Sequence, residues 1–152
     1  VILFMRILFV LLIFSTFPFS VFSKNNSDSL FSLTIIIEDM RSNEGKIRVH
    51  LYDVNNQNSF PTKSYQANKL KIAEIKNNSA IVAFDGLQPN IYAFTVHHDE
   101  NSNEIMDRNY VGMPNEGWGF SNNIKPLFQL PTFQKCCFEL KENKKVIIKI
   151  NY

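Results

Sequence analysis

Residues 91–107 read I-Y-A-F-T-V-H-H-D-E-N-S-N-E-I-M-D, and this stretch predicts both the type of fold and the place of its site. Its first part alternates in the manner of a strand, because aromatic and β-branched side chains recur at every second position. The side chains that share one face are Tyr92, Phe94, Val96 and His98. We therefore expect a strand over residues 91–98 that delivers His98 and Asp99 to the loop that follows.

Short oxygen-bearing side chains occupy alternate positions of that loop. Counted from Asp99, they stand at relative positions 1, 3, 5 and 9, which is the ligand spacing of a calcium loop. A hard divalent cation takes about six to eight oxygens, so the carbonyl at position 7 and a later carboxylate would complete the set. The predicted calcium ligands are Asp99, Asn101, Asn103, Ile105, Asp107 and Glu116.

Two positions of the loop depart from the calcium pattern. Position 6 is Glu104, where the turn usually has glycine, and position 12 is Tyr110, where a bidentate glutamate is usual. With so few carboxylates, we expect a weak site with a dissociation constant on the order of 10⁻⁴ to 10⁻³ M. The alternative is a hydrogen-bonded turn closed by Asp and Asn side chains without an ion.

The segment after the loop contains G-W-G-F, with the only tryptophan of the chain beside a phenylalanine. A tryptophan between glycines can stack on a sugar ring or anchor a protein, so a glycan or an envelope protein is the expected partner. We expect His98 to orient Asp99 by a hydrogen bond, and Phe120 can alternatively fold down to close the end of the fold. The residues predicted either to support the metal ligands or to recognise a partner are His98, Asn115, Trp118, Phe120, Ser121 and Asn122. Of these, Asn115, Trp118 and Asn122 are predicted to form the recognition surface.

A metal-dependent enzyme is the alternative function. It would use His98 with Asp99, Asp107 or Glu116 around a transition metal. Adjacent strand residues point to opposite faces, so only one of the two neighbouring histidines can join a given site. Ser121 lacks the strand-to-helix elbow of a hydrolase nucleophile, which favours a protein without enzymatic activity. A third reading is a purely structural envelope module whose loop binds nothing.

Six further stretches have the composition of strands, and no stretch has a helical period. They are residues 30–38, 46–53, 66–76, 79–85, 134–140 and 145–152. The fold class that we predict is all-β: a seven-stranded antiparallel β-sandwich, immunoglobulin- or transthyretin-like, with one long loop between strands 5 and 6. Residues 55–64 form a second, shorter loop, either an ordinary connection or a binding loop.

One strand shows the alternation with particular clarity. In residues 46–53 the side chains of Ile47, Val49 and Leu51 are expected inside, and those of Arg48, His50 and Tyr52 outside. The neighbours Cys136 and Cys137 would then lie on opposite faces of the strand at 134–140, one buried and one exposed, too constrained for a disulfide.

The first 23 residues have the layout of a secretory signal peptide, with a basic start, an apolar run and small residues before Lys24. A membrane anchor is the alternative, but Pro18 and several hydroxyl residues interrupt the run. We expect residues 24–152 to be a single domain outside the cytoplasm, periplasmic or secreted, with no stable membrane span after cleavage. The formal charge of the whole chain is +2, too near neutrality for a nucleic-acid partner.

H-D-E-N-S-N-E-I-M-D and the later G-M-P-N-E-G-W-G-F-S-N-N resemble a bacterial secreted family catalogued as domain of unknown function 2141. Its members carry H-D-x-N-x-N-G-x-x-D and then G-x-P-x-E-G-[aromatic]-G-F-S-N. The chain departs from the family at two glycine positions, Glu104 and Asn90. The resemblance implies an extracytoplasmic β-sandwich without an assigned activity. The matching residues are His98, Asp99, Asn101, Asn103, Asp107, Gly112, Pro114, Glu116, Gly117, Gly119, Phe120, Ser121 and Asn122.

Overall fold

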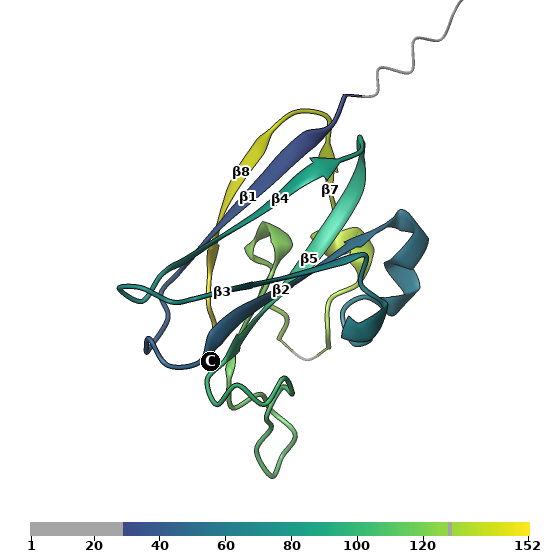
Figure 1. The fold of residues 1–152 in the computed structure, drawn as a ribbon. Helices are drawn as coiled ribbons and strands as arrows, with labels where there is room; N and C mark the ends of the chain where they lie inside the picture. The colour runs from purple at the N-terminus through teal and green to yellow at the C-terminus, as the bar shows by residue number, and fades with distance from the viewer. Residues whose placement is uncertain (1–28, 128) are drawn as a thin grey trace, which may run out of the picture.

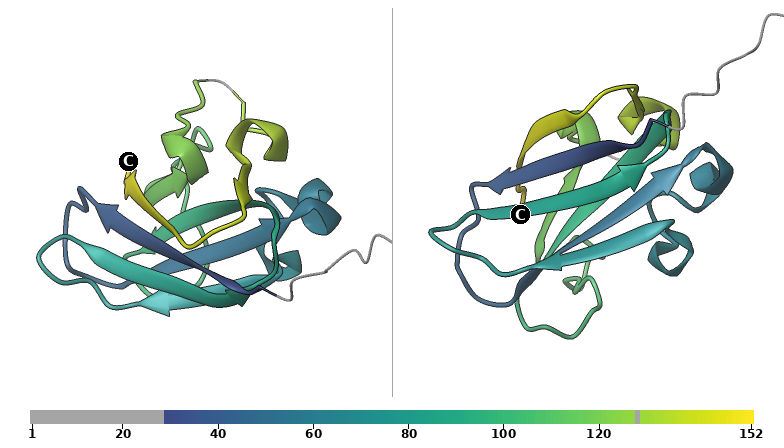
Figure 2. Two further views of the ribbon diagram at one scale, coloured as in Figure 1. Left: turned by 90° about the horizontal axis from the view of Figure 1, so that it is seen from above. Right: turned by 45° about the horizontal axis from the view of Figure 1, so that its top comes forward.

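A computed structural model describes residues 29–127 and 129–152 of the chain. The predicted signal peptide, residues 1–23, lies outside the described residues. Within them the protein is mostly β-structure, arranged as one three-stranded and one five-stranded sheet (Figures 1 and 2). None of the helices in this part of the chain is both long and apolar enough to cross a membrane.

The smaller sheet has the order β4-β1-β8, formed by Ala80–Leu87, Phe31–Glu38 and Lys144–Lys149. The larger sheet has the order β3-β2-β5-β6, and β7 also pairs with β5. Its strands are Lys69–Ala73, Lys46–Asp53, Asn90–Asp99, Gly117–Phe120 and Phe138–Leu140. Short helices lie in the connections: η1 (Val54–Ser59), η2 (Ser64–Gln66), η3 (Ser121–Asn123) and α1 (Phe133–Cys136).

The main hydrophobic core lies between the two sheets. Alternate residues of β1 and β2 enter it, as the two-residue period of a strand requires, and Phe94 and Val96 of β5 join them. The fully buried side chains from β1 and β2 are Leu33, Ile35, Ile37, Ile47, Val49 and Leu51. Those of β2 are the inward residues that the alternation predicted, and the sandwich-like packing of two sheets is confirmed.

The strand count and the direction of one strand pairing differ from the prediction. The described residues form eight strands, and β1 pairs in parallel with β8, so the sandwich is not wholly antiparallel. The additional strand is β6, whose inner face carries glycines in place of apolar side chains. A Cβ on Gly117 would lie 2.6 Å from Ile150 Cγ2, and one on Gly119 would lie 3.0 Å from Ile148 Cγ2. The two sheets approach closely at these glycines, so the inner face of β6 has no room for apolar side chains. The strand therefore lacks hydrophobic alternation.

Two predicted segments also differ in their local structure. The strand expected over residues 134–140 is a turn of helix, α1, followed by the three residues of β7. Phe133 and Cys136, three positions apart, are both buried there, which is a helical spacing. The loop expected over residues 55–64 contains η1 and part of η2. Cys136 is buried and Cys137 is partly exposed, as predicted, and neither forms a disulfide.

A second, smaller core covers part of the outer face of the five-stranded sheet. It consists of Tyr52, Phe60, Ala93, Phe120, Phe133 and Cys136. Tyr52 leaves the sheet on the outer side, as predicted, but this core buries it completely. The second core does not cover the rest of this outer face. His50, His97 and Trp118 lie there, beside the loop that follows β5. The candidate site lies in this region.

Candidate functional site

The loop after β5 begins at a fully buried carboxylate. Asp99 Oδ1 accepts a hydrogen bond from Asn103 N, and Oδ2 accepts one from Glu104 N, both at 3.0 Å. Glu104 adopts the left-handed conformation, with a φ of 68°, that the glycine of a calcium loop usually supplies. Arg48 Nη1 of β2 lies 3.6 Å from Asp99 Oδ2 and partly balances its charge. The loop therefore makes the tight turn that the spacing predicted, despite the non-glycine residue.

Three of the predicted ligands meet on the outer side of this loop. Asn101 Nδ2 donates to Asp107 Oδ2 at 2.7 Å, and Asn103 Nδ2 donates to Asp107 Oδ1 at 3.2 Å. The amide oxygens of both asparagines accept backbone N–H groups two residues further on. Ile105, whose carbonyl is the predicted fourth ligand in chain order, has an exposed side chain. The spacing thus brings Asn101, Asn103 and Asp107 together, whereas the Asp99 carboxylate faces the loop backbone.

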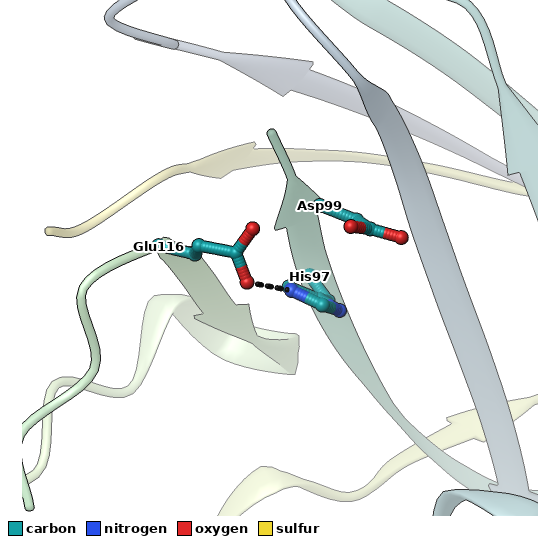
Figure 3. Close-up of side chains that lie close together, drawn as sticks. All are labelled: His97, Asp99 and Glu116. Atoms are coloured by element: carbon teal, nitrogen blue, oxygen red, sulfur yellow. Dashed lines mark hydrogen bonds and ion pairs between the residues drawn. The ribbon is translucent and has the colours of Figure 1, made fainter. Parts of the chain in front are cut away.

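Glu116, just before β6, ties both ends of the loop together. Its Oε1 accepts Glu100 N at 2.9 Å, and its Oε2 accepts Asp107 N at 3.1 Å. Glu116 Oε2 also lies 2.8 Å from His97 Nε2, and Figure 3 shows the carboxylate extending to the ring. Glu116 is buried, so its charge is held by three donors rather than by water. His97, Asp99 and Glu116 each place a possible ligand atom within 4.8 Å of the others.

His98 lies on the other face of β5 and does not bond to Asp99. Its Nδ1 lies 2.7 Å from the hydroxyl of Tyr152, and its Nε2 lies 2.9 Å from the carbonyl of Glu44. The expected hydrogen bond from His98 to Asp99 is replaced by contacts that anchor the C-terminus. His97 stands two positions before Asp99 and shares its face, so the strand period is the signal that could have identified His97.

A polar cavity of about 380 Å³ opens on one side of the loop. Three predicted metal ligands and one predicted recognition residue line it. The whole lining has four carboxylates and two arginines, so negative charge predominates. An ion-pair hydrogen bond from Arg41 lowers the pKa of Glu100, so that this carboxylate stays charged. The lining residues are Arg41, Glu44, Glu100, Asn101, Asp107, Arg108, Asn115 and Glu116.

A second cavity, of about 400 Å³, lies on the other side of the loop and has a largely apolar lining. Its floor is the outer face of β2, β5 and β6, with His50, Thr95, His97 and Trp118. Met106 of the loop stands at its wall. A concave, mostly apolar cavity with a few polar groups is the usual form of a ligand site.

The predicted recognition residues have different surroundings. Trp118 lines the apolar cavity, and its ring centroid lies 5.5 Å from that of Phe120. Phe120 packs into the second core, on the outer face of the five-stranded sheet. Asn115 lines the polar cavity. The Asn122 amide donates to the carbonyls of Cys136 and Cys137, and the Ser121 hydroxyl bonds to the backbone of Phe94. The main contacts of Asn122 and Ser121 are therefore internal to the fold.

Burial, followed by the charges of Arg48 and His97, lowers the pKa of His50 from 6.5 to about 4. The unfolded chain takes up this proton near pH 6.5 and the folded chain only near pH 4. Between these values the unfolded state binds more protons, so we expect stability to fall as the pH is lowered from about 6.5 to about 4. Urea unfolding across this range, with and without His50→Gln, measures the effect. If the free energy of unfolding of His50→Gln fell with pH as steeply as that of the unsubstituted protein, the prediction would be wrong. NMR titration of the His50 ring gives its pKa directly.

A family model described as "Uncharacterized protein conserved in bacteria (DUF2141)" matches residues 35–148. The match spans both sheets and the whole loop between β5 and β6. No curated protein and no solved structure matches the chain.

Proposed function

Because this chain belongs to the DUF2141 family, whose description names no activity, we propose from the site itself that the protein is a calcium-stabilised binding module without enzymatic activity. The observation that carries this proposal is the position of the loop between the two cavities. Asn101 and Asp107 line the polar cavity, and Glu104 and Met106 line the apolar one. An ion on one side would therefore fix the wall of a ligand site on the other.

The chemistry of the polar cavity supports calcium. Asn101, Asp107 and Glu116 supply oxygens within one cavity, and hard cations prefer oxygen ligands. The asparagine amides now donate to Asp107, and a rotation of each amide would present its oxygen to an ion instead. The left-handed Glu104 already gives the loop the turn that calcium loops have. Two arginines border the cavity, which agrees with a weak site.

Trp118 supports a recognition role for the apolar cavity. Its ring is only half-buried and stands at the cavity floor. The flat face of an indole stacks on sugar rings or on the side chains of a protein partner, so we propose a glycan or an envelope protein as the partner. The leader-like first 23 residues support an extracytoplasmic location. The two facing sheets support an immunoglobulin- or transthyretin-like topology.

A transition-metal enzyme is the second candidate, because His97, Asp99 and Glu116 lie close together. Both oxygens of Asp99 and both of Glu116 accept backbone N–H groups, and Arg48 lies beside Asp99. These contacts favour a role in holding the loop over a role in catalysis. Stoichiometric zinc or iron in the purified protein would favour the enzyme.

Thermal unfolding with calcium and with EGTA tests the loop. At about 10 mM calcium and a dissociation constant of about 1 mM, binding adds about 1.4 kcal/mol and raises Tm by about 5 °C. Asp107→Asn removes one of the two charged ligands of the polar cavity, the other being Glu116, and should abolish this rise. Asp107 is the better residue for this test than the buried Asp99, whose loss would disturb the turn itself.

Asp85→Asn is the matched control, because Asp85 is an exposed carboxylate on β4 in the other sheet. We expect it to keep the full calcium shift. Equal midpoints with calcium and with EGTA in the unsubstituted protein would remove the ion from the proposal. An equal rise in all three proteins would show that calcium acts elsewhere.

A further inference from the structure

The floor of the apolar cavity presents an imidazole in a defined tautomer. His97 Nε2 faces the Glu116 carboxylate at 2.8 Å, and a charged carboxylate only accepts hydrogen bonds. The proton of the neutral ring therefore lies on Nε2, and Nδ1 carries the lone pair. Figure 3 shows the second ring nitrogen on the side away from Glu116. A histidine whose other N–H is held by a carboxylate has the arrangement typical of metal-binding histidines.

A second imidazole stands diagonally across the strands from the first. Arg48 is paired with His97, and His50 with Thr95, so His50 and His97 lie on the same face of β2 and β5. Among the described residues, the histidine rings that form hydrogen bonds are His97 and His98, and His50 has no such partner.

Two thioethers stand over the same floor. Met106 and Met113 come from the two arms of the segment between β5 and β6, which are joined by Asn109 N to Met113 O at 2.9 Å and by the bridge of Arg108 with Pro114. Both methionines line the cavity that His50 and His97 line. Thioether sulfur is a soft ligand, which favours copper(I) and disfavours calcium or magnesium.

Because these four side chains line one cavity, we propose that His50, His97, Met106 and Met113 form a copper(I) site there. Imidazole nitrogen and thioether sulfur bind a metal through a lone pair and add no charge to the ion, which suits a monovalent cation in a cavity whose lining is largely apolar. Glu116 positions His97 and does not itself bind the ion. The site lies across the loop from the polar cavity, so it does not require calcium there. It shares the apolar cavity with Trp118, the proposed recognition residue, but uses none of that residue's atoms.

The test is a titration of the full chain with copper(I) under a reductant, in competition with bicinchoninate and in calcium-free buffer. We expect one equivalent to bind, and X-ray absorption of the complex to show both nitrogen and sulfur neighbours. Met113→Leu conserves side-chain volume and should weaken binding at least tenfold, as should His50→Gln. The matched control is Met40→Leu, because Met40 is buried in the main core. That control should bind copper(I) as the unsubstituted protein does.

Several results would overturn the site. They are the absence of one-to-one binding, a nitrogen- and oxygen-only coordination shell, and full affinity in a folded His50→Gln, Met113→Leu double variant. Circular dichroism of each variant establishes that it is folded. A calcium-dependent shift of Tm without copper(I) binding overturns this inference and leaves the proposed loop function standing. Copper(I) binding without any calcium-dependent shift of Tm supports this site and contradicts only the calcium part of the proposed function.

Discussion

Gly45→Ala is expected to destabilise the protein by about 3–5 kcal/mol. Gly45 immediately precedes β2 and has a φ of +69°, where an alanine is strained. A Cβ at this position would lie 1.9 Å from the carbonyl oxygen of Asp99 and 2.5 Å from Glu100 Cα. Both are backbone atoms at the start of the loop, so no side chain can move aside. The variant must separate β2 from the end of β5 or remain unfolded, and urea unfolding followed by circular dichroism measures the loss.

Gly112→Ala is the matched control for that substitution. Gly112 also has a positive φ, +83°, but a Cβ there would meet no atom within 4 Å. Only the backbone strain then applies, about 1–2 kcal/mol. If Gly45→Ala lost no more stability than Gly112→Ala, the close contact of Gly45 with Asp99 would be wrong.

Glu116→Ala is the second substitution with a large expected effect, also about 3–5 kcal/mol. It removes the acceptor of two backbone N–H groups, those of Glu100 and Asp107, and the partner of His97. All three donors lose their bond, the His97 ring in a buried place and the two amides in partly buried ones, and the two ends of the loop lose their link. Chemical unfolding at pH 7 measures the change in stability, and hydrogen exchange of the two amides reports the loop separately.

Glu116→Gln distinguishes the hydrogen bonds of this side chain from its volume. The amide keeps one acceptor oxygen and the same shape, so we expect a smaller loss of about 1–2 kcal/mol. Glu139→Ala, at an exposed position of β7, is the surface control and should change stability by less than about 0.5 kcal/mol. A loss for Glu116→Ala as small as that of Glu139→Ala would show that Glu116 does not hold the loop.

The fold was predictable where hydrophobic alternation decides the structure. Residues 46–53 form β2 with the predicted bounds, because each second side chain enters the core. β6 was not predictable in this way, since Gly117 and Gly119 leave its inner face without side chains. Its place depends on contacts with Ile148 and Ile150, distant in the sequence. The parallel pairing of β1 with β8 likewise depends on residues more than a hundred positions apart.

The candidate site was predictable to the extent that it is local. The spacing from Asp99 to Asp107 indicated the turn and the meeting of Asn101 with Asp107, both of which the loop forms within itself. His97 was not predicted as a site residue, because His98 directly precedes Asp99 in the sequence and was assigned that role. The two-residue period of a strand nevertheless puts His97, not His98, on the face of Asp99. The approach of His50 to His97 is set by the register of two strands, which a single sequence does not encode locally.

The position of β1 in the smaller sheet has a consequence for the time at which the protein can fold. β1 is the central strand, with β4 on one side and β8 on the other. Its residues pair with residues of β8 that lie more than a hundred positions later in the chain, such as Leu33 with Lys144. While the chain is being synthesised, β1 therefore lacks one neighbour until β8 has been made, so the smaller sheet is completed only after every strand of the larger sheet is already present.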